Sequence, residues 1–177
     1  MKKLLIAAAL LALVGFGCAK APAATNVAIP EGGKAYDNAQ YGISLALPKD
    51  VEMRQREDAV RKTKYLGLDV DFFASLRDTV REEKAVNLAF FYAVSKMSTD
   101  DFAKALEASG ANGAVKVKST EDLTINGVAM KRITSTTEMG EDKVHYLFDA
   151  KDSTIIVSEF IGENEEFEPI LGTISVK

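Results

Sequence analysis

This chain of 177 residues is poor in the side chains on which many catalytic and metal-binding sites depend. It has no tryptophan, one histidine (His145) and one cysteine (Cys18). A single cysteine cannot form an internal disulfide, and one histidine with one thiol is too few for a structural zinc site or a Cys–His nucleophile. The sequence also lacks a glycine-rich phosphate loop, a G-x-S-x-G motif and the D-x-D-x-D-G spacing of a calcium loop. We therefore expect no cofactor and no metal, and we expect that the protein is not an enzyme.

A long apolar run that could span a membrane is also missing. Lys2 and Lys3 precede an apolar run from Leu4 to Phe16, which is shorter than the roughly 17–25 residues that a membrane-spanning helix requires. A positive start followed by a short apolar run is typical of a secretory signal peptide. We predict that residues 1–17 form this signal, with residues 1–23 as the alternative.

Two cleavage sites fit this signal. Gly17 followed by Cys18 resembles a bacterial lipoprotein signal, in which the cysteine is lipid-modified and becomes the new N-terminus, although Gly15 stands where that family usually has Leu or Val. The alternative is an A-x-A site at residues 21–23, which would release a soluble protein beginning at Ala24. A leftover cysteine in an exported protein needs an explanation, and this favours Cys18 as a lipidation site. More than one acyl chain would make the anchoring stable.

The mature chain is mildly acidic. Removal of residues 1–17 takes away Lys2 and Lys3 and leaves 20 basic and 26 acidic residues. This balance disfavours nucleic acid as a partner. Residues 18–34 are rich in Ala, Pro and Gly and predict a flexible tether. The expected location is the periplasmic or cell-surface side of a bacterial membrane, to which the N-terminal lipid would anchor the protein.

Residues 35–177 are enough for a single domain, and they predict mainly strands. Alternation of apolar residues indicates strands in several segments, and residues 86–95 are apolar almost throughout, as in a central strand buried on both faces. Asn126-Gly127 is a strong hairpin signal. The predicted strands are 41–47, 51–56, 66–76, 86–95, 115–118, 123–125, 128–136, 143–149, 154–160 and 174–176. A helix from Phe73 through Leu76 and Val80 is an alternative to the end of the third strand.

Two helices are predicted between these strands. Ser98 and Asp101 have the spacing of a capping box, which predicts a helix to Ser109 with Gly110 as its C-terminal stop. A second, short helix is expected no earlier than Glu165, because Pro169 is tolerated only in a first turn.

The order of these elements resembles the PsbP-like superfamily of small α/β/α sandwich domains. The resemblance lies in YGISLALP (41–48), the helix STDDFAKALEASG (98–110), DLTINGVAMKRI (122–133) and the ending EEFEPILGTISVK (165–177). It implies an α+β domain with a mostly antiparallel central sheet flanked by helices. The superfamily includes bacterial envelope lipoproteins, photosystem accessory subunits and a regulator of a small GTPase, which implies a binding or assembly role. No family binding residues match positions of this chain.

His145 is the one residue that could act as a general base or metal ligand. In its predicted strand, Val144, Tyr146 and Phe148 share an apolar face, and His145 lies on the opposite face with Lys143. We interpret it as a solvent-facing or edge histidine, because a catalytic or metal site needs partners.

The charged residues offer two further hypotheses. Asp69 and Asp71 would share one face of a strand and could perform acid–base chemistry. The simpler interpretation is that they form the solvent-facing side of a half-buried strand. The basic cluster is a candidate surface for a protein partner or for lipid headgroups, and its alternative is a solvated edge protected by charge. This cluster comprises Arg54, Arg56, Arg61, Lys62 and Lys64.

The sequence therefore favours an exported, membrane-tethered, non-enzymatic binding or assembly module of the bacterial cell envelope, with an envelope protein as its partner. The first alternative is an extracytoplasmic carrier of a small apolar ligand, which would require a pocket between sheet and helices. The least favoured alternative is a carboxylate-dependent hydrolase, which would require a concave site containing Asp69 and Asp71, or either of them with an acidic partner from the C-terminal segment.

Overall fold

The computed structural model describes residues 29–56, 60, 64–79, 86–110, 113–159 and 164–177. Strands occupy 58% of the structure and helices 14%, so the fold is more strongly dominated by sheet than the predicted α/β/α sandwich. The strands are β1 (Lys34–Asn38), β2 (Ile43–Leu47), β3 (Val51–Gln55), β4 (Lys64–Tyr65), β5 (Leu68–Asp78), β6 (Val86–Ser95), β7 (Lys116–Ile125), β8 (Val128–Thr136), β9 (Asp142–Ala150), β10 (Ser153–Glu159) and β11 (Ser175–Val176). The helices are α2 (Thr99–Ser109) and α3 (Asn164–Leu171).

The strands form two antiparallel sheets. The large sheet has the order β3-β5-β6-β10-β9-β8-β7, and the short strand β4 pairs with β5. The small sheet has the order β1-β2-β11. Most neighbours in the large sheet are joined as hairpins, while the β6–β10 pairing brings the middle of the chain against its last third. The prediction of a mostly antiparallel sheet is therefore confirmed.

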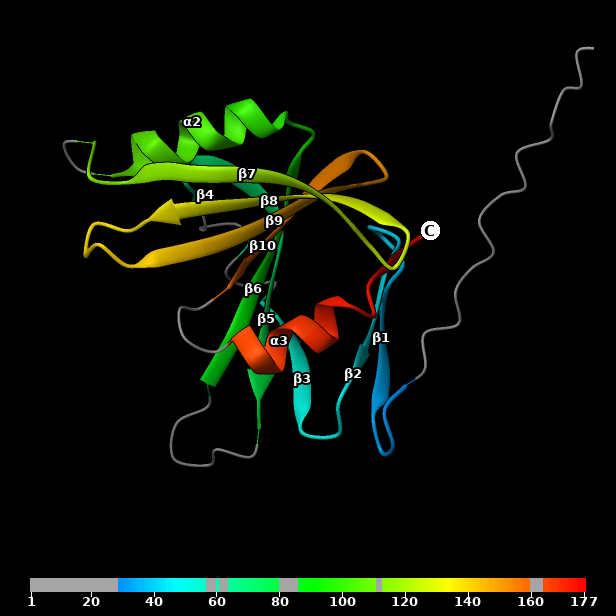
Figure 1. Ribbon diagram of the computed structural model, residues 1–177. Coiled ribbons are helices and arrows are strands. Elements are labelled where there is room, and N and C mark those ends of the chain that lie inside the picture. The colour runs from blue at the N-terminus through cyan, green and yellow to red at the C-terminus, as the bar shows by residue number, and fades with distance from the viewer. Residues whose placement is uncertain (1–28, 57–59, 61–63, 80–85, 111–112, 160–163) are drawn as a thin grey trace, which may run out of the picture.

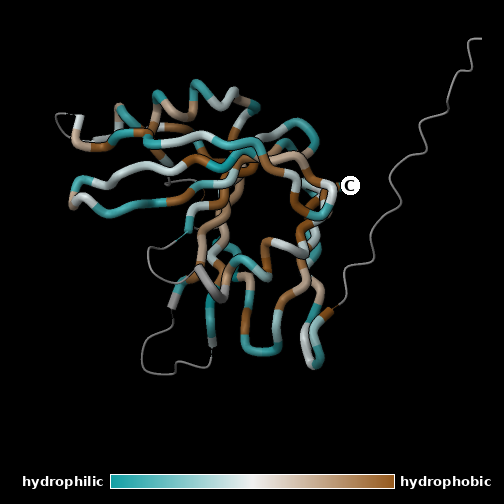
Figure 2. Tube along the Cα trace, viewed as in Figure 1, coloured by the Kyte–Doolittle hydropathy of each residue, from teal (hydrophilic) through white to brown (hydrophobic). Residues whose placement is uncertain are grey.

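The large sheet separates two hydrophobic clusters. One cluster lies between the sheet, the small sheet and α3, and it contains Leu45, Phe91, Tyr146 and Phe167. The other lies under α2 and contains Tyr92, Phe102, Leu106 and Leu147. Figure 1 shows α2 against one face of the sheet and α3 on the other side of it, next to β1 and β2. Figure 2 shows apolar residues concentrated along the inner strands, whereas α2 carries several hydrophilic residues.

Helix α2 begins as the sequence predicts. The Ser98 side chain accepts a hydrogen bond of 3.1 Å from the backbone N–H of Asp101, and two acidic residues lie in the first turn. Phe102 and Leu106 are buried against the sheet. Gly110 follows the helix as predicted, but in an extended conformation rather than the left-handed one that is common for glycines at this position. Glycine is required at this position for a steric reason, because a Cβ there would lie 2.5 Å from the backbone nitrogen of Val115.

Several other boundaries differ from the prediction. Residues 116–125 form one strand with a register shift between Val117 and Ser119, where two strands were expected. Helix α3 begins at Asn164, and Pro169 lies inside it rather than in its first turn. The sequence did not indicate β1 or β4. These strands are short, and β1 is polar and largely exposed because it lies at the edge of the small sheet.

Candidate functional site

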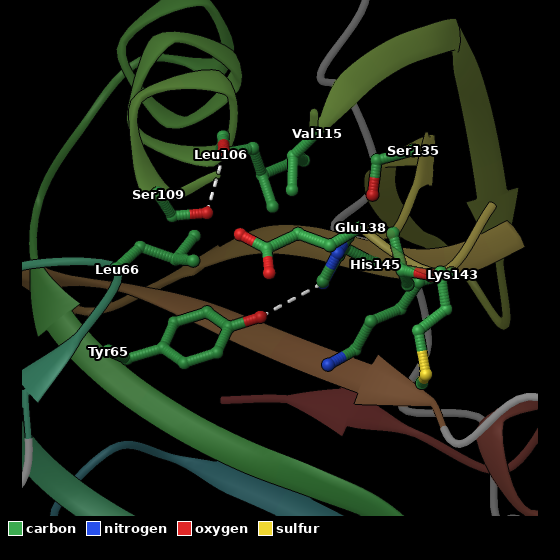
Figure 3. Close-up of a pocket in the computed structure, with 11 residues that line it drawn as sticks. Tyr65, Leu66, Leu106, Ser109, Val115, Ser135, Glu138, Lys143 and His145 are labelled. Carbon is green, nitrogen blue, oxygen red and sulfur yellow. Dashed lines mark hydrogen bonds between the residues drawn. The ribbon is translucent and has the colours of Figure 1, made fainter. Parts of the chain in front are cut away.

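A pocket of about 460 Å³ lies beneath the C-terminal end of α2. Its walls come from three parts of the chain that are distant in sequence: the β4–β5 turn, the end of α2, and the β8–β9 hairpin. Leu66, Leu106, Val115 and Met139 supply an apolar lining. The volume and the apolar walls are typical of sites that bind small organic molecules. Figure 3 shows Leu66, Leu106 and Val115 around the space beneath the helix.

Tyr65 and His145 form a hydrogen-bonded pair in this pocket. The Tyr65 hydroxyl lies 3.1 Å from Nδ1 of His145, and the pair is drawn in Figure 3. Burial, with a smaller effect of the nearby Lys143 charge, lowers the pKa of His145 to about 3. Burial also raises the pKa of Tyr65. Near neutral pH, both side chains are therefore uncharged, and the pair can orient a ligand by hydrogen bonding.

The expectation that His145 faces solvent or lies at an edge is wrong. Its side chain is 1% exposed, because β9 lies inside the sheet between β10 and β8 and α2 covers this face. The ring of Phe102 meets the imidazole edge-on, with centroids 5.4 Å apart. Nε2 of His145 is buried and has no hydrogen-bond partner in the described part of the structure. An unpaired buried polar atom of this kind is costly.

Lys143 is the cationic residue of the pocket wall. It lies two residues before His145 on β9 and therefore projects from the same face of the sheet. Burial lowers the pKa of its ammonium group. Figure 3 shows the Lys143 side chain directed into the same space as the Tyr65 hydroxyl.

The exposed tip of the β8–β9 hairpin forms the rim of the pocket. The backbone N–H of Thr137 donates to the Glu141 carbonyl at 2.6 Å, and the backbone N–H of Glu141 donates to the Thr137 hydroxyl at 3.2 Å, which closes the loop. Glu138 and Met139 lie between them and also line the pocket. Met139 is 82% exposed, which is unusual for a large apolar side chain.

The β4–β5 turn contributes a residue in an uncommon conformation. Leu66 has a φ of 54° and Gly67 a φ of 81°, so the turn needs two residues in the left-handed region. The β7–β8 hairpin meets the same need with Asn126 and Gly127, the pair that this turn favours. A leucine in this conformation costs roughly 1–2 kcal/mol. Leu66, the strained residue, therefore also places an apolar side chain in the pocket wall.

The basic cluster is only partly described. Arg54 lies on the edge strand β3, and Arg54 and Arg56 are both exposed. Lys64 forms an ion pair of 3.0 Å with Asp69 across β4 and β5. Arg61 and Lys62 lie outside the described residues, as does Cys18.

The structure does not bring Asp69 and Asp71 into one cavity. Asp69 pairs with Lys64. Asp71 lines a second, more polar cavity of about 480 Å³, together with Asp37 and Gln55. Asp37 is engaged by Ser44 and by Lys177, and these contacts lower its pKa. Within the described residues, no group of three or more His, Cys, Asp or Glu side chains is placed to hold a metal ion.

A second buried titratable group lies at the end of β10, away from the α2 pocket. Glu159 is 3% exposed, and burial raises its pKa to about 7. The Glu168 charge contributes to this higher pKa, whereas Tyr146 and Arg132 oppose the shift.

Sequence reasoning missed Tyr65, Leu66 and Lys143 as site residues, and it misjudged His145. One signal was present for the histidine. Leu147 shares the face of His145 on the strand, and an apolar neighbour at i+2 indicates that this face is covered. The other residues come from a short turn and a strand end, for which the sequence has no periodic pattern.

Comparisons with known proteins bear on the fold. No family model matches the sequence, and no curated protein matches it. The structure is similar to the solution structure of cyanobacterial PsbP (CyanoP) from Synechocystis sp. PCC 6803, with a TM-score of 0.50, 10% identity, and coverage of 82% of this chain and 92% of that one. A protein of unknown function from Pseudomonas aeruginosa matches with a TM-score of 0.33, 12% identity, and coverage of 77% and 89%. At such identities the likeness to CyanoP concerns the fold alone, and it supports a PsbP-like fold for this chain.

Proposed function

We propose that this protein is an exported small-molecule binding module that is tethered to a bacterial membrane through Cys18, and that its ligand occupies the pocket beneath α2. The observation that carries the proposal is the pocket itself, about 460 Å³ in volume with mainly apolar walls. Among the functions considered from the sequence, the carrier is the one that requires a pocket between sheet and helix.

Two features of the pocket support a binding role over a structural void. The strained Leu66 and the exposed Met139 both line it. Backbone strain and exposed apolar side chains each cost stability or solubility, and they concentrate at functional sites. A void that arose only from imperfect packing would not need either.

The tether is supported by the sequence alone. Neither α2 nor α3, the helices in the described part of the chain, is long and apolar enough to cross a membrane. The proposed anchor is therefore the lipid on Cys18, and residues 19–34 would hold the domain at a distance from the bilayer. The mass of the mature N-terminus tests this part: a lipid-modified Cys18 is expected, and an unmodified start at Ala24 would remove the anchor from the proposal.

Ligand binding can be tested with N-phenyl-1-naphthylamine, an uncharged apolar probe that fluoresces when it leaves water. The wild-type protein is expected to enhance its fluorescence in a saturable manner. Ser109→Trp should abolish this enhancement, because Ser109 is exposed at the end of α2 and lines the pocket, so that an indole there would fill it.

Ala108→Trp is the matched control for this substitution. Ala108 is also exposed on the last turn of α2 but does not line the pocket, so this variant should bind the probe like the wild type. Absence of saturable binding in the wild type, or equal loss in the two tryptophan variants, would contradict the proposed function.

A further inference from the structure

We propose that the ligand of the α2 pocket is a single-chain amphiphile with a carboxylate head group, and that Lys143 pairs with this head group. The inference rests on the proposed function, since it specifies the chemistry of the molecule that the pocket takes. It follows from the position of Lys143, the cation of a largely apolar wall whose other charged residue, Glu138, lies at the exposed rim.

Lys143 differs from other lysines of the chain in its surroundings. Several other lysines in the described part of the chain form ion pairs, such as Lys118 with Asp142 and Lys131 with Asp122. For Lys143, the described residues provide no carboxylate partner, and desolvation is what displaces its pKa. A half-buried ammonium group without a counter-ion is destabilised, and an anion that enters the pocket would remove this cost.

Tyr65 supplies a second polar contact for a carboxylate. Its hydroxyl is hydrogen-bonded to Nδ1 of His145 and lines the same pocket as Lys143. In the tautomer in which Nδ1–H of His145 donates to the Tyr65 oxygen, the Tyr65 hydroxyl keeps its own proton to donate to a carboxylate. A carboxylate has two oxygens and can accept hydrogen bonds from more than one donor. The ammonium and the phenol together match this geometry better than they match a neutral alcohol, because hydrogen bonds to a charged group are stronger.

The remaining walls match an aliphatic chain. Leu66, Leu106 and Val115 line the pocket with apolar groups, and the exposed Met139 extends this surface to the rim. Methionine and leucine side chains can adjust to the irregular outline of a flexible chain. A ligand with one charged end and an apolar body would therefore leave little of this surface exposed to water.

Glu138 is the negative charge that faces the pocket, and it opposes an anion. It lies on the exposed rim, where water and salt screen its effect. Lys143 is half-buried in the wall, where the screening is weaker. The net preference is thus set by Lys143, and Glu138→Gln should strengthen carboxylate binding a few-fold.

The inference can be tested by displacing N-phenyl-1-naphthylamine from the wild-type protein with three ligands of equal chain length, the two ionic ones below their micelle concentrations and the alcohol below its solubility limit. Dodecanoate should displace the probe at a concentration about tenfold lower than 1-dodecanol, as expected for one hydrogen bond to a charged group. Dodecyltrimethylammonium should be the weakest of the three. Lys143→Met should abolish the preference for the carboxylate over the alcohol, and Lys143→Arg should retain it.

Lys104→Met is the matched control, because Lys104 is exposed on the outer side of α2 and pairs with Asp101. It removes the same charge without touching the pocket, and the preference should persist. Thermal melting of each variant establishes that it folds, and the comparison of ligands on the wild-type protein does not depend on any variant.

The outcomes separate this inference from the proposed function. If the probe does not bind, the proposed function itself fails. If the probe binds but dodecanol or the ammonium compound displaces it as well as dodecanoate, the pocket stands and the carboxylate inference is overturned. Persistence of the preference in Lys143→Met would likewise overturn the role of Lys143.

Discussion

The Tyr65 hydroxyl lies 3.1 Å from Nδ1 of His145 at the base of the α2 pocket, while Nε2 of the same ring has no hydrogen-bond partner among the described residues. This pair joins the short β4–β5 hairpin to the central strand β9. The histidine therefore depends on one hydrogen bond for most of its polar stabilisation. Its neighbours on this face include the apolar side chains of Phe102 and Leu147.

Removal of the Tyr65 hydroxyl should leave both ring nitrogens of His145 unpaired. We expect Tyr65→Phe to lower the free energy of unfolding by about 1–2 kcal/mol, the usual cost of a buried polar group that loses its partner. His145→Leu removes the buried polar atoms, so Tyr65→Phe should cost much less in that background. Urea unfolding of the two single variants and the double variant measures this coupling. Strictly additive effects would contradict it.

Acid should destabilise the protein through His145. Its pKa is about 3 in the fold, against 6.5 ordinarily. As the pH falls through 6.5, the unfolded chain binds a proton that the folded chain does not, so the free energy of unfolding should fall by up to about 1.4 kcal/mol per pH unit until roughly pH 3. His145→Leu should lose this contribution. Unfolding curves between pH 7 and 4 that have equal slopes in both proteins would rule it out.

A rise in pH from about 4.5 to 7 should destabilise the protein through Glu159. Its pKa of about 7 in the fold lies above the ordinary 4.5. The folded state holds a proton that the unfolded state releases, so this contribution is present below pH 4.5 and is lost as the pH rises through about 7. Glu159→Gln should therefore be more stable than the wild type at pH 8, by about 3 kcal/mol. The two proteins should differ little at pH 4.5, and a constant difference across this range would be the contrary result.

Replacement of Leu66 should weaken ligand binding with little change in the stability of the protein. Leu66→Asn places the favoured residue of this turn at a φ of 54°, and the relief of strain should offset the lost apolar packing. The free energy of unfolding is expected to change by less than about 1 kcal/mol. The affinity for N-phenyl-1-naphthylamine should fall several-fold, because an apolar wall residue is lost. A variant with unchanged affinity would show that Leu66 does not serve the pocket.

The sequence predicted the elements that have a strong local signal. Asn126 and Gly127 form the expected hairpin, with both φ angles positive, and the Ser98 cap begins α2. The apolar strand of residues 86–95 is central in the sheet, between β5 and β10. In each case, the local preference and the tertiary structure agree.

The pocket could not be predicted in the same way. Leu66 occupies a turn position for which its own preference is unfavourable, so no turn signal marks it. His145 lies on a face whose cover is α2, an element about 40 residues earlier in the chain, and alternation within a strand does not reveal what covers each face. From the sequence, Lys143 is expected at the surface, because lysine is rarely buried. Each of these depends on contacts between distant segments.

The most direct test of the account is to map the ligand on the ¹⁵N-labelled mature domain with NMR. On titration with dodecanoate, saturable shift changes are predicted for the backbone amides around the pocket: Tyr65 and Leu66, the last turn of α2, and residues 135–145. The amides of the small sheet, β1, β2 and β11, should stay unchanged. Saturable changes centred on the small sheet, or no saturable change at all, would contradict the claim that the pocket beneath α2 binds a small amphiphilic ligand.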